Sequence, residues 1–179
     1  VYGIEHVCFP SLADSKKRTI LLGGFSKDYA MSGWRIGYAA GPAEFIKGLV
    51  RINQYTVMSA PTMSQTAALE ALKVGEPFVV DMLNEYDRRR KLIVTGFNRL
   101  GLDTFEPRGA FYAFPRINLA GMNDETFAES LLNEEHVAVV PGSAFGAGGE
   151  GFVRCSYATA YEKIEEAIRR IEQFMRRHG

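Results

Sequence analysis

The stretch TILLGGFSKDYAMSGWRIGYAAGP, from Thr19 to Pro42, contains the residues that best indicate the fold and the chemistry of this chain. It begins with a short apolar run that ends in two glycines, and a strand that runs into glycines commonly leads to a polar loop at the edge of a sheet. That loop contains Ser26 and Lys27. A second apolar run follows, with Arg35 near its start. The return between the two runs is expected to place Lys27 and Arg35 beside one another.

These two cations suit a cofactor that has both an aldehyde and a phosphate group. A lysine that is desolvated or close to another positive charge loses its proton readily, so it can attack an aldehyde and form a Schiff base. An arginine keeps its charge and binds phosphate with a planar fork of donors. Pyridoxal phosphate has both groups. A loop lysine is more often a solvated surface charge, so the pair alone leaves that alternative open.

The longer string resembles the lysine segment of class I and II aminotransferases, which are fold-type I enzymes that use pyridoxal phosphate. The resemblance depends on Ser26-Lys27, on AMSGWR from Ala30 to Arg35, and on Gly37-Tyr38. In that family the lysine holds the cofactor as a Schiff base, and the arginine eight residues later binds its phosphate. The resemblance therefore implies that Ser26, Lys27 and Arg35 bind the cofactor and that Lys27 is catalytic. Some members have a phosphate-binding serine where this chain has Gly24.

A third cation, Arg154, lies in the sequence FVRCSY, from Phe152 to Tyr157. Strand alternation places Phe152, Arg154 and Ser156 on one face of the expected strand, and an arginine on a largely apolar element needs an anion. Glu150 is one candidate for that anion. In the resembling family the arginine of the matching strand binds the α-carboxylate of the amino acid through a bidentate fork, which implies a substrate-binding role for Arg154. Two other segments also resemble parts of the family's active site. PRGAFY, residues 107–112, resembles a turn on the substrate side of the pocket, and PGSAFG, residues 141–146, resembles a mobile loop over the active site.

The resemblance covers nearly all of the chain but only the latter half of an aminotransferase. It implies an α/β fold class, namely a partial fold-type I transferase. Residues 1–75 would form the C-terminal part of the large pyridoxal-phosphate-binding domain, residues 76–101 an interdomain helix, and residues 102–179 the small C-terminal domain. Apolar periodicity independently predicts helices, Pro61 indicates the first turn of one of them, and short β-like runs predict strands. The helices are expected at 43–54, 61–73, 78–100, 124–134 and 164–175, and the strands at 103–105, 110–114 and 137–140.

Composition restricts the classes of protein that remain. The chain has 179 residues, of which 46% are hydrophobic, enough to bury a core as one domain or as one domain plus part of another. Lysine plus arginine equals aspartate plus glutamate at 21 each, so no basic field indicates binding to nucleic acid or to a membrane surface. Cys8 and Cys155 match no metal-ligand spacing, so we expect no metal and a reducing cytoplasm. No apolar run is long enough to span a bilayer.

These observations lead to one main hypothesis and two alternatives. The main hypothesis is a cytoplasmic, homodimeric aminotransferase of amino acid metabolism and biosynthesis, which uses pyridoxal phosphate to transfer an amino group from an amino acid to a 2-oxo acid. A carbon–sulfur lyase or synthase of the same fold is the first alternative, because fold does not determine reaction type. The second is a non-catalytic fragment or regulatory domain. Homodimerisation is implied by the resemblance only.

Overall fold

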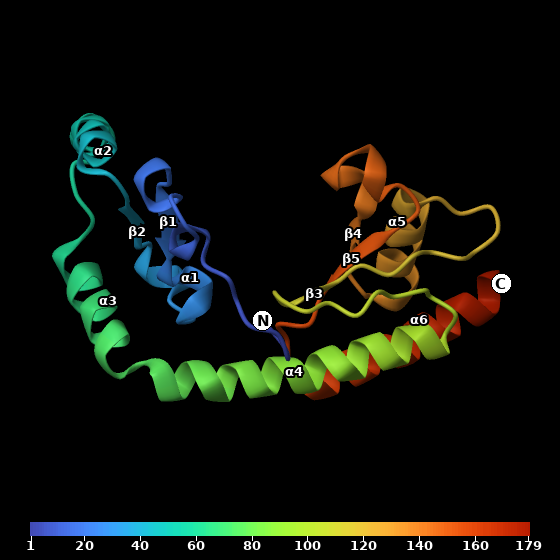
Figure 1. Ribbon diagram of the computed structural model, residues 1–179. Helices are drawn as coiled ribbons and strands as arrows, with labels where there is room; N and C mark the ends of the chain where they lie inside the picture. The colour runs from blue at the N-terminus through green and yellow to red at the C-terminus, as the bar shows by residue number, and fades with distance from the viewer. The chain divides into compact units, whose positions relative to one another are not determined.

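The structure is a computed structural model that describes all residues from 1 to 179 (Figure 1). It divides into two compact units. We call residues 5–83 the N-terminal unit, and residues 84–179 together with 1–4 the C-terminal unit. The division falls inside helix α4 (Glu76–Arg99). None of the helices combines the length and the apolar character needed to cross a membrane.

The N-terminal unit is built on a two-stranded antiparallel ribbon. Strand β1 (Leu21–Gly24) pairs with β2 (Gly37–Ala40), and Gly24 lies opposite Gly37. Between the strands lie one turn of α-helix, α1 (Phe25–Asp28), and one 3₁₀ turn, η3 (Ser32–Trp34). Two further 3₁₀ turns, η1 (Phe9–Ser11) and η2 (Lys16–Arg18), precede the ribbon.

Two helices complete the N-terminal unit, and both confirm the sequence-based predictions. Helix α2 spans Ala43–Thr56 and α3 spans Thr62–Val74. Each follows a proline, Pro42 or Pro61, whose extended backbone keeps it outside the helix at the N-cap position. Neither helix buries much of itself, because α2 has no buried residue and α3 buries only two small side chains.

The C-terminal unit combines a small antiparallel sheet with three helices. The strand order is β3 (Tyr112–Ala113), β5 (Val153–Ser156) and β4 (Val140–Pro141). Residues 84–99 of α4 pack with helices α5 (Asp124–Glu135) and α6 (Tyr161–His178) around one core. Two 3₁₀ turns, η4 (Gly142–Phe145) and η5 (Ala147–Gly149), follow β4.

The core of the C-terminal unit is formed by one stripe of α6 and by the elements that it covers. Ile164, Ile168 and Ile171 are each at most 5% exposed, as expected from their helical spacing. Helix α4 approaches α6 closely at Gly96, where a Cβ atom would lie 2.6 Å from the side chain of Ile168. The ring of Phe174, which the sequence analysis did not single out, is fully buried against Phe127 at 5.4 Å between ring centroids.

The expected strands were only partly correct. Residues 103–105 form no strand, and of the expected strand 137–140 only Val140 is paired, together with Pro141. The reason is that β4 pairs with only two positions of β5, so the apolar residues before it have no neighbour with which to form a ladder. Strand β1 also begins two residues later than the apolar run and includes both glycines. Glycine is required at Gly23, because the ring of Tyr38 lies where a side chain there would be.

Candidate active site

The segment that contains Lys27 is fixed by a buried phenylalanine. Phe25 is 4% exposed, and its ring lies 5.4 Å from the ring of Tyr29 and 6.0 Å from that of Tyr38. Its N–H donates to the carbonyl of Ile36 at 3.2 Å, which continues the β1–β2 pairing by one step. Phe25 therefore anchors the turn α1, in which Lys27 is exposed to solvent.

Arg35 lies on the other side of the same return, in an uncommon backbone conformation. Its φ of 49° and ψ of 51° belong to the left-handed region, which a residue with a Cβ atom enters at a cost of roughly 1 kcal/mol. The Arg35 Nη1 donates to the carbonyl of Ser32 at 3.0 Å, and no carboxylate of the chain forms an ion pair with Arg35. Arg35 is the C-cap residue of η3, and β2 begins two residues after it.

Ser32 connects the two sides of the return. Its hydroxyl donates to the carbonyl of Ser26 at 3.3 Å, while its own carbonyl accepts from Arg35. Because Lys27 follows β1 and Arg35 precedes β2, the register places both at the same end of the ribbon. In the sequence Ser32 appears only as part of the motif, and no role was predicted for it.

Arg154 belongs to the C-terminal unit and lies on β5, as expected. Its neighbours Val153 and Cys155 are buried, whereas Arg154 is half-buried, so alternation along the strand is as predicted. The Arg154 guanidinium carbon lies 4.5 Å from the ring centroid of Tyr112 and 4.5 Å from that of Phe145. No carboxylate pairs with Arg154. The alternative that Glu150 neutralises it was therefore wrong.

The turn before Tyr112 is held by two tyrosine hydroxyls. Ala110 has a φ of 59°, and its carbonyl accepts from Tyr2 at 2.5 Å and from Tyr157 at 3.0 Å. The guanidinium of Arg90 lies 4.9 Å from the ring centroid of Tyr2. Burial raises the pKa of the Tyr157 hydroxyl, which keeps it protonated as a donor. The sequence analysis missed these contacts because their partners lie 47 and 108 residues apart.

The loop after β4 is more constrained than its glycine content suggested. Gly142 and Gly149 approach so closely that a Cβ atom on either would lie 2.0 Å from the carbonyl oxygen of the other. The N–H of Gly142 also donates to the carbonyl of Phe152 at 2.8 Å. Glycine is therefore needed in this loop for close backbone packing, and the expected mobility finds no support in these contacts.

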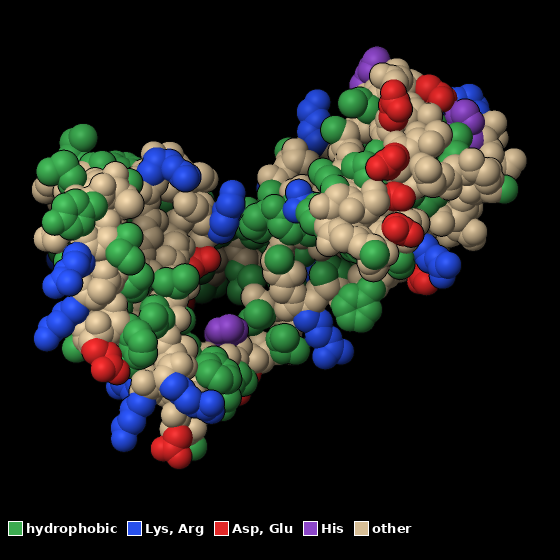
Figure 2. All heavy atoms as spheres, turned by 90° about the horizontal axis from the view of Figure 1, so that it is seen from above, with side chains coloured by type: hydrophobic (Ala, Val, Ile, Leu, Met, Phe, Trp, Pro, Cys, Tyr) green, Lys and Arg blue, Asp and Glu red, His purple; other side chains and the backbone are tan.

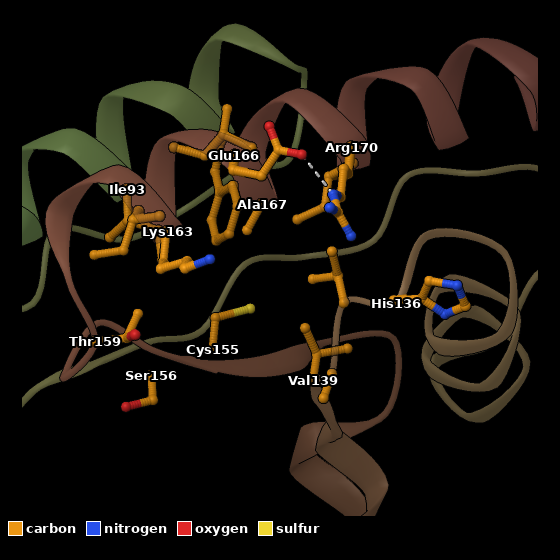
Figure 3. Close-up of a pocket in the computed structure, with 16 residues that line it drawn as sticks. Ile93, His136, Val139, Cys155, Ser156, Thr159, Lys163, Glu166, Ala167 and Arg170 are labelled. Atoms are coloured by element: carbon orange, nitrogen blue, oxygen red, sulfur yellow. Dashed lines mark hydrogen bonds and ion pairs between the residues drawn. The ribbon is translucent and has the colours of Figure 1, made fainter.

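A separate cavity of about 520 Å³ lies in the C-terminal unit, between α6 and the chain around β5 (Figure 3). Lys163 and the ion pair between Glu166 and Arg170, at 2.7 Å, lie on its α6 side. Cys155 also lines it, but burial raises the pKa of that thiol to about 12, so the thiol is not ionised near neutral pH and is a poor nucleophile.

The structure therefore brings three of the four expected site residues together. Ser26, Lys27 and Arg35 share one end of the ribbon in the N-terminal unit, and Arg154 lies in the C-terminal unit. In both places an arginine lacks an acidic partner within the chain. Such guanidinium groups are suited to binding an anion from outside.

Comparisons with known proteins identify the family of the chain. A family model described as aminotransferase class I and II matches residues 2–171. An aspartate aminotransferase from Pyrococcus abyssi is 48% identical over 175 residues, which are 97% of this chain and 45% of the relative. Aromatic-amino-acid aminotransferase 2 from Thermococcus litoralis is 45% identical over 176 residues, again 97% and 45% of the two chains.

A solved structure extends the comparison to three dimensions. The crystal structure of an aromatic aminotransferase from Pyrococcus horikoshii OT3 matches with a TM-score of 0.94 and 47% identity, covering 99% of this chain and 48% of that one. The match confirms the mixed α/β fold predicted from the sequence. The chain spans about half the length of the curated relatives that it matches.

Proposed function

Because the chain belongs to the aminotransferase class I and II family, we propose that it forms part of a pyridoxal-phosphate-dependent enzyme that transfers an amino group from an amino acid to a 2-oxo acid. The observation that best supports this is the return between β1 and β2, where Ser32 links the turn of Lys27 to Arg35. The names of the relatives make aspartate and aromatic amino acids the first substrates to test.

The residues at this end of the ribbon fit pyridoxal phosphate. Lys27 is exposed to solvent, and Arg35 has no acidic partner in the chain that would compete with a phosphate. A Cβ atom at Gly24 would meet nothing within 4 Å, so there is open space beside the turn. When bound, pyridoxal phosphate supplies an electron sink for the charge that develops at the substrate α-carbon.

Lys27 is the residue to which we assign the proton transfer. Its Nζ would hold the cofactor through the aldehyde and would move the proton at the substrate α-carbon. Ser26 and Arg35 would bind the phosphate end, with Arg35 contributing a fixed positive charge. Phe25 helps to position Lys27, because the burial of its ring fixes the turn on which Lys27 lies.

Arg154 is the residue to which we assign the substrate α-carboxylate. Its guanidinium is flanked by two aromatic rings and has no carboxylate partner in the chain. A planar fork of donors matches a carboxylate in a bidentate arrangement, and fixing the carboxylate limits which bond at the α-carbon faces the reacting group.

The larger organisation is part of the same proposal. We assign residues 1–75 to the large cofactor domain, 76–101 to an interdomain helix and 102–179 to the small domain. We also propose a cytoplasmic homodimer that acts in amino acid biosynthesis. Family membership supports the dimer, and the two unpaired cysteines, Cys8 and Cys155, are compatible with a reducing compartment.

Borohydride trapping tests the assignment of Lys27. The complete protein, as its gene encodes it, is loaded with pyridoxal phosphate, reduced with borohydride and digested for peptide mass spectrometry. We expect the pyridoxyl group on the peptide that contains Lys27, and its loss in Lys27→Arg. Lys47→Arg is the matched control, since Lys47 is an exposed lysine of the same unit. Labelling of a different lysine in the unmodified protein would overturn the assignment.

Product analysis tests the reaction type. With L-aspartate or L-phenylalanine as amino donor and 2-oxoglutarate as acceptor, we expect glutamate and the 2-oxo acid of the donor in equal amounts. Release of ammonia from an amino acid without any acceptor would instead support the lyase of the same fold.

A further inference from the structure

Asp124 is a buried carboxylate that serves a loop rather than its own helix. It is the first residue of α5 and is 4% exposed. The N-cap of α5 is the preceding residue, Asn123, whose side-chain oxygen accepts from the N–H of Thr126 at 2.8 Å. The carboxylate of Asp124 accepts instead from the N–H of Ser143 at 2.8 Å and from that of Gly151 at 3.4 Å. One side chain thus ties down both ends of the loop.

The charge on Asp124 is stabilised by these contacts. The hydroxyl and the backbone N–H of Ser143 lower the pKa of the Asp124 carboxyl, and the N–H of Gly151 contributes in the same direction. Hydrogen bonds to an ionised acceptor are stronger than those between neutral groups. The loop is therefore held by a carboxylate that stays ionised at neutral pH.

Phe145 depends on this loop for its position. It lies two residues after Ser143, in the turn η4, and its side chain is 51% exposed, so packing alone restrains it weakly. One face-to-edge contact with Phe114, at 6.2 Å, is its only ring–ring contact. Since the side chain is so open, the backbone contacts of the loop determine where the ring lies.

The ring of Phe145 in turn flanks Arg154. The guanidinium carbon lies 4.5 Å from this ring and 4.5 Å from the ring of Tyr112, which is held on β3 by pairing with β5. Cation–π contact restrains the plane of a guanidinium without using its N–H donors. The donors of Arg154 therefore remain available for a carboxylate, while its orientation is limited by the two rings.

We propose that Asp124 is a positioning residue for substrate binding: by holding the loop 143–151 it keeps Phe145 against Arg154, so that the guanidinium is preorganised for the substrate carboxylate. The inference rests on the proposed role of Arg154. It adds that Phe145 and Asp124, although neither is expected to bond to the substrate, determine how tightly the carboxylate is bound. Preorganisation increases affinity because less conformational freedom is lost on binding.

The test compares variants of the complete protein, loaded with pyridoxal phosphate. Asp124→Asn removes the charge at nearly constant shape, and Phe145→Leu removes the ring but keeps an apolar side chain. Glu125→Gln is the matched control, because Glu125 is an exposed acid in the same helical turn. KM and kcat are measured with L-aspartate and L-phenylalanine. Calorimetry then measures the Kd of 3-phenylpropanoate, which has a carboxylate and no amine, and binding of 2-phenylethylamine, which lacks the carboxylate.

We expect Asp124→Asn and Phe145→Leu each to raise KM and the Kd of 3-phenylpropanoate by roughly three- to tenfold, with kcat changed by less than about twofold. Binding of 2-phenylethylamine and the properties of Glu125→Gln should not change. The double variant should be no worse than the more affected single variant, because both residues act through Arg154. Phe145→Tyr, which keeps a ring, should restore the unmodified values.

Several results would overturn the proposal. Unchanged KM and Kd in Phe145→Leu would contradict it even if Asp124→Asn failed to fold, since the exposed Phe145 side chain is not needed for folding. Fully additive effects would place the two residues in independent roles. If the unmodified protein transferred no amino group, the proposed function would fail, and the calorimetric measurements with 3-phenylpropanoate would still decide whether Asp124 positions Arg154.

Discussion

The two compact units differ sharply in how much of their apolar surface they bury. The C-terminal unit has one contiguous core of fifteen buried residues, whereas Phe25 and Ala68 are the buried hydrophobic residues of the N-terminal unit. Large side chains there are open to solvent, with Tyr55 at 88%, Met58 at 78% and Met63 at 77% exposed. Figure 2 shows apolar side chains reaching the surface among lysines and arginines.

The contrast concerns function as well as stability. Lys27 and Arg35 lie on the unit with little core of its own, and Arg154 lies on the unit with an extensive one. Local stability follows buried apolar contacts. We therefore expect Arg154, to which we assign the substrate carboxylate, to be held more rigidly in the isolated chain than Lys27 and Arg35, which we assign to the cofactor.

Removing a core ring should have the largest effect. Phe174→Ala in the C-terminal unit, where the ring is fully buried, should lower the free energy of unfolding by about 3–5 kcal/mol. Tyr55→Ala in the N-terminal unit should change it by less than about 0.5 kcal/mol, because the side chain is already exposed. Urea unfolding of the 179-residue chain measures both. Equal losses would show that the two units do not differ as described.

The two cysteines report the same difference through their reactivity. Cys155 is buried in the C-terminal unit with its pKa raised to about 12, whereas Cys8 of the N-terminal unit is partly exposed. At pH 8, iodoacetamide should alkylate Cys155 at least about a hundredfold more slowly than Cys8. Peptide mass spectrometry follows the rates, and unfolding in urea should make them similar. Similar rates in the folded chain would mean that the C-terminal core opens readily.

A pair of opposed glycines tests the ribbon itself. A Cβ atom on Gly37 would lie 2.8 Å from the carbonyl oxygen of Gly23, whereas one on Gly24, the pairing partner of Gly37, would meet nothing within 4 Å. Gly37→Ala should destabilise the N-terminal unit by about 1–3 kcal/mol. Gly24→Ala should be neutral or slightly stabilising. Hydrogen exchange resolved by unit gives the measurement, and equal effects of the two changes would contradict the register.

The smallest expected effect is a pH dependence in the C-terminal unit. The pKa of Asp124 is lowered by folding, so its contribution to stability is fully present above its unfolded value of about 3.9 and is lost as the pH falls through the folded value. Asp124→Asn should therefore cost about 1 kcal/mol at pH 7 and less at pH 3. Urea unfolding at the two pH values measures this cost. If the loss of unfolding free energy were the same at both pH values, it would not come from ionisation of Asp124.

Periodicity was enough to predict the helices and not enough to predict the strands. The apolar stripes that predicted α2, α4, α5 and α6 are local, since residues three and four apart share a face. Pro61, which indicated the start of α3, is a local signal as well, and all five helices were found near the expected bounds. A strand needs a pairing partner, and the partner of β4 is β5, which is distant in the sequence. The local sequence at 137–139 therefore could not show that these apolar residues have no partner strand.

The same limit applies to the candidate site. The family motif was sufficient to single out Lys27 and Arg35, because both lie within one short string. The aromatic neighbours of Arg154 come from two separate segments, at Tyr112 and Phe145, and no spacing in the sequence relates them. Asp124 looked only like the first residue of a helix, although its carboxylate serves a loop that begins 19 residues later.

The left-handed backbone at Arg35 has a consequence for how this chain would respond to selection. A glycine at that position would relieve the steric cost that any side chain with a Cβ atom incurs there. A library screened only for yield of folded protein should therefore accumulate glycine at position 35. A library screened for growth that depends on amino-group transfer should retain the arginine, and the two enriched sequences would diverge at this residue first.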